Sequence, residues 1–381
     1  MKFVIKICIL LMIFSIYIPC SAEEVIPGAV SGILIDADSG KIIFEKNKNK
    51  KVAMASLTKM MSQIIILEEI EKGNIKWDDI VVVSKTAQDM GGSQIYIEMG
   101  ERISIRDLMK GISMASGNDA TVMMAEVISG TEEKFVERMN KKAKELGLKN
   151  TKFVNCTGLD EEGHYSTAYD LSVIARELVI NHPSILEFSS LYEDYLREGT
   201  DKKFWLVNTN KLVHFYEGAD GLKTGHTDNA GYCLAATAKR GDLRLIGIVL
   251  GEKDSKIRNS ETMSLLDYGF NTVKMNKLMS KDEVVKKISI DKASDKELEI
   301  VMCDDLNILE NKSSEKVNYR FKYSINEIKL PLKKGEVIGK VKVYNGKYIK
   351  SGNLCINKDI KRLSFFDLYL KNIISTFSGN L

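Results

Sequence analysis

Residues 54–62 read MASLTKMMS, and the segment from Ser56 to Ile70 carries apolar residues on most of its faces. Such a pattern predicts a helix that is buried in the protein core. Ser56 and Lys59 are three positions apart, and residues at that spacing face the same side of a helix. The stretch therefore predicts a serine hydroxyl at a helix start, with a lysine amine one turn away.

The Ser56–Lys59 pair predicts covalent catalysis. A serine hydroxyl is a poor nucleophile until a neighbouring group takes its proton. A lysine takes a proton only when it is neutral, so its pKa must fall well below the ordinary value of about 10.4. Burial and a second cation both lower that pKa, and Lys223 is the candidate cation. We therefore predict an enzyme that attacks an amide bond, with Ser56 as the nucleophile and Lys59 as the base.

Two further motifs, Ser116-Gly117-Asn118 and Lys223-Thr224-Gly225, supply additional polar groups. We expect Ser116 to relay a proton between Lys59 and the leaving nitrogen, and Asn118 to hold the substrate amide. Lys223 and Thr224 are expected to bind a carboxylate. The three motifs would then lie on a helix start, a loop and a strand, which together can form the walls of one cleft.

The backbone N–H groups of Ser56 and His226 are candidates for an oxyanion hole.

Copies of the short motifs recur at 289–292, 313–316 and 350–353. The copy at 313–316 lies in the polar run NKSSEK, which has no apolar face to hold it. The copies at 350–353 overlap, so one short segment would have to form two walls. These contexts favour the first set of motifs.

Four parts of the chain differ in composition and in the pattern of their apolar and polar residues. Residues 1–22 combine a basic start, an apolar run and small residues, which predicts a cleaved signal peptide, with an uncleaved anchor as the alternative. Residues 23–274 mix helix-like and strand-like segments, including two predicted hairpins, 30–45 and 232–250. Helices are also predicted at 106–114, 118–127 and 132–146, the last with Thr131 as its cap and Gly147 at its end.

Residues 275–357 consist of short strand-like segments separated by polar turns, which predicts a small all-β domain. Residues 358–381 begin with basic residues and continue as LSFFDLYLKNIISTFSGNL from Leu363. One face of this segment is apolar, which predicts an amphipathic helix that anchors the protein to a membrane surface. The alternative is a terminal helix that packs on the protein's own core.

Four longer strings carry a resemblance to a known family. They are MASLTKMMS at 54–62, MASGNDAT at 114–121, GHYSTAYDLS at 163–172 and DGLKTGHTDNAGYC at 220–233. Together they closely resemble the low-molecular-weight penicillin-binding proteins that act as D-alanyl-D-alanine carboxypeptidases. The resemblance covers nearly the whole mature chain. It implies an α+β fold, with a β-lactamase/transpeptidase-like domain of antiparallel sheet and helices, a small all-β domain and a terminal anchor.

The resemblance implies removal of the terminal D-alanine from peptidoglycan stem pentapeptides, through an acyl-enzyme on Ser56. It implies that β-lactam antibiotics acylate and inhibit the same serine. The partners would be stem peptides ending in D-Ala-D-Ala, β-lactams and the membrane surface. The protein would be exported and would act at the outer face of the cytoplasmic membrane or in the cell wall space.

The resemblance also assigns site residues. Arg258 matches the position of an arginine that binds the terminal carboxylate in the family, with a solvated arginine as the alternative. The family can place another basic residue near 208–210, where this chain has Thr209 with Lys211 nearby. The residues expected to bind substrate are Asn118, Lys223, Thr224, Gly225, His226 and Arg258.

Composition excludes several classes of protein. The formal net charge is only +3, whereas a nucleic-acid binder carries a dense basic face. The histidines do not have the spacing of metal ligands, and we predict neither a metal nor a cofactor; they are His164, His182, His214 and His226. The four cysteines beyond the signal have no Cys-x-x-Cys pair, and buried free thiols are favoured over disulfides; they are Cys156, Cys233, Cys303 and Cys355.

Two other functions stay open at this point. A serine β-lactamase would share the acylation chemistry and would need a deacylating carboxylate, for which Asp160, Glu161 and Glu162 are candidates in an otherwise ordinary polar turn. A catalytically silent wall-binding protein would keep the fold without the reaction. The intact motifs favour the carboxypeptidase over both alternatives.

Overall fold

The computed structural model describes residues 24–364 except 296 and 316, together with 366, 367 and 369. Two compact units divide them: the first holds the chain up to Arg240 and Arg244–Tyr268, and the second holds Gly241–Leu243 and the chain from Gly269 onward. The domain boundaries given above remain predictions. The signal peptide, and most of the segment assigned to the anchor, lie outside the described residues. Within the described part of the chain, no helix is long and apolar enough to cross a membrane.

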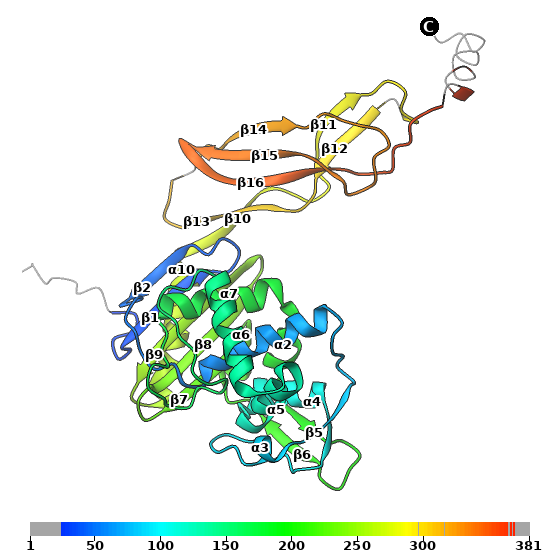
Figure 1. The fold of residues 1–381 in the computed structure, drawn as a ribbon. Helices are drawn as coiled ribbons and strands as arrows, with labels where there is room; N and C mark the ends of the chain where they lie inside the picture. The colour runs from blue at the N-terminus through cyan, green and yellow to red at the C-terminus, as the bar shows by residue number, and fades with distance from the viewer. Residues whose placement is uncertain (1–23, 296, 316, 365, 368, 370–381) are drawn as a thin grey trace, which may run out of the picture. The chain divides into compact units, whose positions relative to one another are not determined.

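A five-stranded sheet forms the centre of the first unit (Figure 1), and its strand order is β2-β1-β9-β8-β7. Its strands are β1 (Ser31–Asp36), β2 (Ile42–Lys46), β7 (Ala219–Thr227), β8 (Gly231–Arg240) and β9 (Leu243–Glu252). β1 pairs antiparallel with β2, and β8 is the neighbour of β9. Both hairpins predicted from the sequence are therefore present.

Apolar side chains on both faces of the central strands explain the layered architecture. Every residue of β1 is buried, as in a strand covered on both faces. Ile33 and Ile35 join the core that includes α7 (Ala168–Asn181). Leu34 faces the other way, where it lies with Gly247 near Leu265 of α10 (Ser255–Thr272). Helices thus pack on both faces of the sheet.

Three helices, α5 (Asn118–Ser129), α6 (Glu132–Glu145) and α7, pack on α2 (Lys59–Glu71), the buried helix predicted from Ser56 to Ile70. Thr131 caps α6 by accepting a hydrogen bond from the Lys134 N–H, as predicted. The other helical elements are η2 (Ala55–Thr58), α3 (Lys85–Gln88), α4 (Ile105–Lys110), η3 (Gly111–Ala115), η4 (Pro183–Ile185), α8 (Leu186–Ser189) and α9 (Leu212–Phe215). Two short hairpins complete the unit: β3 (Ile80–Val82) with β4 (Arg102–Ser104), and β5 (Glu193–Leu196) with β6 (Phe204–Val207).

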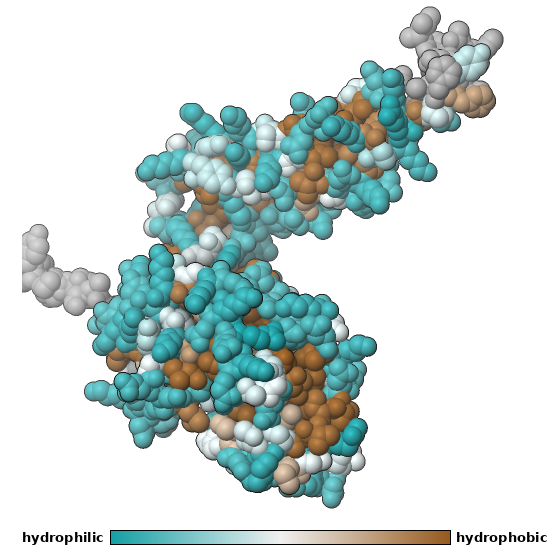
Figure 2. Space-filling model, in the orientation of Figure 1, coloured by the Kyte–Doolittle hydropathy of each residue, from teal (hydrophilic) through white to brown (hydrophobic). Residues whose placement is uncertain are grey.

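The second unit is built from strands, so the predicted all-β domain is confirmed. A two-stranded sheet pairs β10 (Val273–Met279) with β13 (Leu306–Asn311). A five-stranded sheet has the order β11-β12-β16-β15-β14. Its strands are β11 (Val284–Ser289), β12 (Glu297–Met302), β14 (Arg320–Ile325), β15 (Val337–Asn345) and β16 (Lys347–Ile356). In the view of Figure 2, hydrophilic residues cover most of the visible surface of each unit, and apolar side chains emerge in scattered patches.

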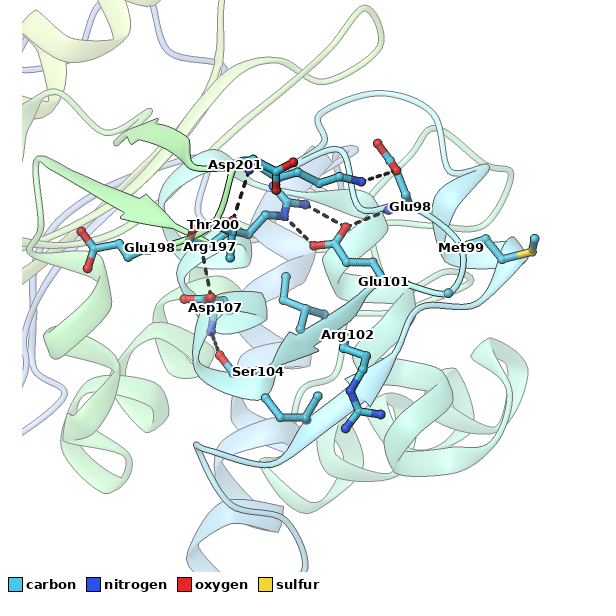
Figure 3. Close-up of a pocket in the computed structure, with 14 residues that line it drawn as sticks. Glu98, Met99, Glu101, Arg102, Ser104, Asp107, Arg197, Glu198, Thr200 and Asp201 are labelled. Carbon is cyan, nitrogen blue, oxygen red and sulfur yellow. Dashed lines mark hydrogen bonds and ion pairs between the residues drawn. The ribbon is translucent and has the colours of Figure 1, made fainter.

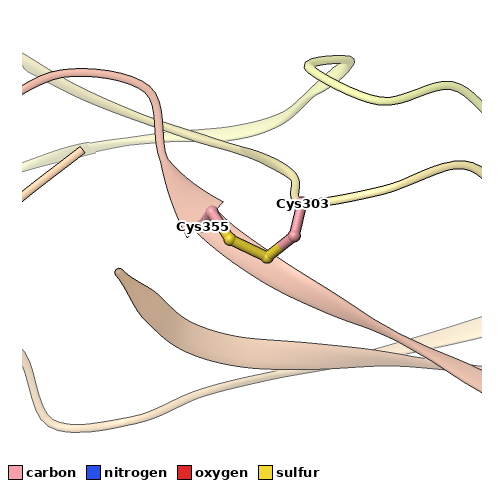
Figure 4. The surroundings of a disulfide bond; sticks show 2 residues. All are labelled: Cys303 and Cys355. Atoms are coloured by element: carbon pink, nitrogen blue, oxygen red, sulfur yellow. A yellow bond between two sulfur atoms is a disulfide. The ribbon is translucent and has the colours of Figure 1, made fainter. Parts of the chain in front are cut away.

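The cysteine prediction is half wrong. Cys303 and Cys355 form a disulfide with a Cα–Cα distance of 5.2 Å (Figure 4). Cys303 follows β12 and Cys355 lies on β16, and these strands are neighbours in the sheet. The pairing brings together residues 52 positions apart, which no local spacing rule detects. Cys156 and Cys233 are buried and free, as predicted.

Candidate active site

Ser56 and Lys59 lie within hydrogen-bond distance of each other. The chain enters α2 through the 3₁₀ turn η2, which contains Ser56. Side chains three residues apart are nearly eclipsed in a 3₁₀ turn. Lys59 Nζ is accordingly 3.0 Å from Ser56 Oγ, the contact that the spacing predicts.

The Lys59 amine has two further partners. It donates hydrogen bonds to Asn118 Oδ1 at 2.6 Å and to the backbone oxygen of Thr157 at 2.7 Å. The side chain is fully buried. Burial lowers the pKa of Lys59 to about 7, although Cys156 and Asp119 act in the opposite direction. The site thus provides an amine that is substantially neutral near neutral pH.

Ser116 lies at the end of η3, a segment of π-helix that interrupts the helix predicted over 106–114. Its backbone is left-handed, with φ 64° and ψ 29°, a conformation that costs a non-glycine residue about 1 kcal/mol or more. Its Oγ is buried and has no hydrogen-bond partner among the described residues. The cap of α5 is Gly117, so the Ser116 hydroxyl is not occupied in capping. A hydroxyl without a partner is available to a substrate or a water molecule.

Both ends of the Asn118 side chain are held. Its Oδ1 accepts from Lys59, and its Nδ2 donates to the backbone oxygen of Gly91 at 2.7 Å. The backbone N–H of Asn118 donates to Ser93 at 2.7 Å. The neighbouring Asp119 carboxylate is buried and accepts from the N–H groups of Ile95 and Ile97. The loop between α3 and β4 therefore fixes the amide against Lys59.

The predicted lysine-threonine-glycine strand is the edge strand β7. Lys223 is buried and donates to the backbone oxygen of Thr224 at 2.9 Å. Burial lowers the pKa of Lys223 well below its ordinary value, and the nearby cations Lys59 and Arg258 add to this effect. Both charged groups that act on this amine are cations, so neither provides an acidic partner for it. A bound carboxylate would supply the missing opposite charge and favour the protonated form of Lys223.

Gly225 allows β7 to lie directly against the turn that carries Ser56. A Cβ at Gly225 would be 2.8 Å from the Leu57 side chain and 3.1 Å from Ala55. A substitution here would therefore push β7 away from η2. Thr224 Oγ1 donates to Thr209 Oγ1 at 2.8 Å, so a hydroxyl occupies the position where the family can place a basic residue.

His226 and Arg258 have different environments. His226 is exposed, and its ring stacks on Tyr232 with a centroid distance of 4.0 Å. The Arg258 side chain is only 5% exposed, so the solvated alternative is wrong. Its guanidinium donates to Asn259 Oδ1 at 2.8 Å and 3.1 Å, and burial lowers its pKa.

Several residues that contact the site belong to none of the three sequence motifs. Thr157 acts through a backbone oxygen, which no side-chain pattern reveals. Thr209 contacts Thr224, whereas Lys211 lies over the Tyr192 ring at 5.3 Å. The carboxylates proposed for a β-lactamase, residues 160–162, are exposed. No group of three or more potential metal ligands is found among the described residues.

A separate pocket of about 580 Å³ lies where the 98–104 segment meets the β5–β6 hairpin (Figure 3). Arg197 donates to the Glu101 carboxylate across this pocket. None of the predicted site residues lines it. The ion pair fastens the β5–β6 hairpin to the loop between α3 and β4, which also contacts Asn118.

The sheet flanked by helices, with the half-buried Ser56 beside the buried Lys59, defines a serine peptidase with a transpeptidase-like fold. The family model for D-alanyl-D-alanine carboxypeptidase (peptidase S11) matches residues 21–254. The model for the C-terminal domain of penicillin-binding protein 5 matches residues 274–362. The chain therefore belongs to the D-alanyl-D-alanine carboxypeptidase family. The predicted family, the enzyme class and the α+β transpeptidase-like fold with its all-β domain are confirmed, whereas the C-terminal helix stays a prediction.

Curated relatives span nearly the same length. The chain is 44% identical to D-alanyl-D-alanine carboxypeptidase DacF of Bacillus subtilis, over 90% of this chain and 88% of that protein. It is 34% identical to D-alanyl-D-alanine carboxypeptidase DacC of Escherichia coli, over 88% of this chain and 84% of that protein.

Solved structures are similar too. Penicillin-binding protein 5 of Haemophilus influenzae is 31% identical, with a TM-score of 0.69 over 88% of this chain and 98% of that one. Penicillin-binding protein D2 of Listeria monocytogenes, in its ampicillin-bound form, is 34% identical, with a TM-score of 0.58 over 64% of this chain and 98% of that one.

Proposed function

We propose that this chain removes the terminal D-alanine from peptidoglycan stem pentapeptides through an acyl-enzyme on Ser56, and that β-lactams acylate the same residue. The observation that carries the proposal is the buried Lys59 amine, which is 3.0 Å from Ser56 Oγ and has a pKa lowered to about 7. The family supports the substrate class. The ampicillin-bound form of the Listeria monocytogenes relative supports the antibiotic.

The hydrogen bonds around Lys59 suit the role of a base. A neutral amine has two N–H donors and one lone pair. The two donors match the oxygens of Asn118 and Thr157, which leaves the lone pair for the Ser56 hydroxyl proton. A protonated amine would instead donate to all three oxygens. The neutral form is thus held ready to accept the proton as Ser56 attacks the carbonyl carbon.

The remaining residues act on the substrate. The N–H groups of Ser56 and His226 stabilise the oxyanion. Lys223, Thr224 and Arg258 bind the terminal carboxylate, whose charge compensates the buried amine of Lys223. The unpartnered Ser116 hydroxyl carries a proton from Lys59 to the nitrogen of the leaving D-alanine. Water then hydrolyses the ester and frees Ser56.

The test is release of D-alanine from a peptide ending in D-Ala-D-Ala by the purified full-length protein. We expect release by the wild type and none by Ser56→Ala, with unchanged thermal unfolding. Wild-type protein that folds but releases no D-alanine would refute the proposal. Rapid turnover of a chromogenic cephalosporin would favour a β-lactamase instead.

The protein acts on the cell wall, outside the cytoplasm, as its family does. We further propose that it is exported by residues 1–22 and held at the outer face of the cytoplasmic membrane by residues 358–381. The basic and apolar sequence of the terminal segment supports this anchor. Deletion from Lys358 onward should move the protein from the membrane fraction to the soluble fraction. A truncated protein that still sediments with membranes would refute the anchor.

A further inference from the structure

A chain of three hydrogen bonds ends on the peptide group just before the nucleophile. His164 Nδ1 accepts a hydrogen bond from the Val154 N–H at 3.0 Å. His164 Nε2 is 2.8 Å from Thr58 Oγ1, and Thr58 Oγ1 donates to the backbone oxygen of Ala55 at 2.8 Å. Thr58 is fully buried, and His164 is 6% exposed. None of the three catalytic motifs includes His164.

The direction of this chain is set by the backbone. Because Nδ1 accepts from the Val154 N–H, the neutral His164 ring carries its proton on Nε2. Nε2 therefore donates to Thr58, and the Thr58 hydroxyl must turn its own proton toward Ala55. A protonated ring would place an N–H against the Val154 N–H. Burial opposes that form and lowers the pKa of His164 to about 4, despite Glu161 and Asp160 nearby.

The Ala55 carbonyl is held in a strained conformation. Ala55 has a backbone φ of 47°, in the left-handed region that residues with a Cβ rarely adopt. Gly158, with φ 92°, lies against its oxygen, and a Cβ at Gly158 would be 1.9 Å away. Strain of this kind persists only where its surroundings enforce it. Thr58 and Gly158 supply these surroundings.

Holding this carbonyl also aims the N–H of Ser56. The peptide group is planar and trans, so the Ala55 C=O and the Ser56 N–H point in opposite directions. Fixing the oxygen on the side of Thr58 and Gly158 turns the N–H toward the opposite side. In the proposed mechanism, that N–H stabilises the oxyanion.

We propose that Thr58 and His164 are positioning residues that aim the Ser56 N–H at the oxyanion by holding the Ala55 carbonyl. The inference rests on the proposed function. Its effect falls on the transition state and the tetrahedral intermediate, because the negative charge on the oxygen develops only there and not in the bound ground state. Removing one oxyanion-hole donor outright slows catalysis by about 10²–10³-fold. A donor that is present but misaligned should cost less, roughly 10- to 100-fold.

The test compares Thr58→Val with Thr58→Ser in the full-length protein. Valine has nearly the shape of threonine but no hydroxyl, whereas serine keeps the hydroxyl and loses a methyl group. Stopped-flow acylation by a chromogenic β-lactam separates the dissociation constant from the acylation rate constant. For Thr58→Val we expect an acylation rate constant lower by roughly 10- to 100-fold, with a nearly unchanged dissociation constant. Thr58→Ser should stay close to the wild type.

Two results would overturn the inference. One is acylation by Thr58→Val at the wild-type rate. The other is an equal loss in both variants, which would assign the effect to packing and not to the hydroxyl. Should Thr58→Val lower the melting temperature severely, His164→Leu provides the second test, with His164→Gln as its control. The leucine variant lacks a donor to Thr58 and should acylate slowly, whereas the glutamine amide can donate and should restore the rate.

The wild type separates this inference from the proposed function. A wild type that is never acylated refutes the proposed function. A wild type that acylates normally, alongside a Thr58→Val variant that does so equally fast, refutes only the role of Thr58 and His164.

Discussion

The ionisation of Lys59 should control the pH dependence of acylation. The pKa of Lys59 is lowered to about 7 by burial, so about half of the enzyme carries a neutral amine at pH 7. A lysine with the ordinary pKa of about 10.4 would be neutral in only about one molecule in 2,500 at that pH. Burial thus raises the reactive fraction by roughly a thousandfold.

The measurement is the second-order rate constant for acylation by benzylpenicillin between about pH 5.5 and 9. Below the pKa of Lys59, we expect the rate constant to rise about tenfold for each pH unit. Above about pH 8 it should level off, because the amine is then about nine-tenths neutral. A rate constant that is flat across this range, or that still rises tenfold per unit at pH 9, would refute Lys59 as a base whose pKa is lowered by burial.

Asn118→Asp is the matched perturbation. It would replace the amide oxygen, 2.6 Å from Lys59 Nζ, with a carboxylate of nearly the same shape. An opposite charge at that distance favours the protonated amine by about 1–3 pKa units, so the inflection should move to higher pH. Lys59→Arg retains a cation that cannot act as a base, and it should abolish acylation at every pH. An inflection that stays in place in Asn118→Asp would assign the titration to another group.

Three other predictions follow from buried groups and from the disulfide. Lys223→Gln removes a buried amine without an acidic partner, so the melting temperature should hold or rise while release of D-alanine falls by roughly 100-fold; an unchanged release rate would contradict carboxylate binding. Burial, followed by the neighbouring Glu261, raises the pKa of Glu252 to about 8. Glu252 therefore keeps a proton in the folded state that the unfolded chain has released, so stability falls as the pH rises from about 4.5 to 8. Glu252→Gln should then raise the melting temperature at pH 8.5 more than at pH 5, and equal shifts at both values would contradict this assignment. Replacing both Cys303 and Cys355 by serine should lower the unfolding free energy of the second unit by up to about 4 kcal/mol, the loop entropy for a separation of 52 residues; a denaturant midpoint unchanged from the oxidised wild type would contradict it.

The contact between the nucleophile and its base, the hairpins and the all-β domain could be predicted from short stretches of sequence. The contact between Ser56 and Lys59 depends only on a spacing of three within a helical turn. The hairpins depend on apolar runs that flank polar turns. The all-β domain depends on the change, near residue 276, from mixed segments to short strand-like segments separated by polar turns. In each of these, the signal lies within a few residues of the feature that it predicts.

Features that depend on the three-dimensional arrangement could not be predicted in the same way. The disulfide joins neighbouring strands that are distant in sequence. The third partner of Lys59 is the backbone oxygen of Thr157, and every residue has such an oxygen. The left-handed backbone of Ser116 follows from the π-helical segment before it. Burial of Arg258 depends on how α10 packs against the sheet.

The most direct test of Ser56 as the nucleophile is the intact mass of the protein after incubation with benzylpenicillin, with Ser56→Ala as the control. We expect one covalent adduct of the mass of the drug in the wild type, located on Ser56 by peptide mapping, and none in the variant. An adduct on another residue, or intact penicillin with unmodified protein, would show that Ser56 is not the acylated nucleophile.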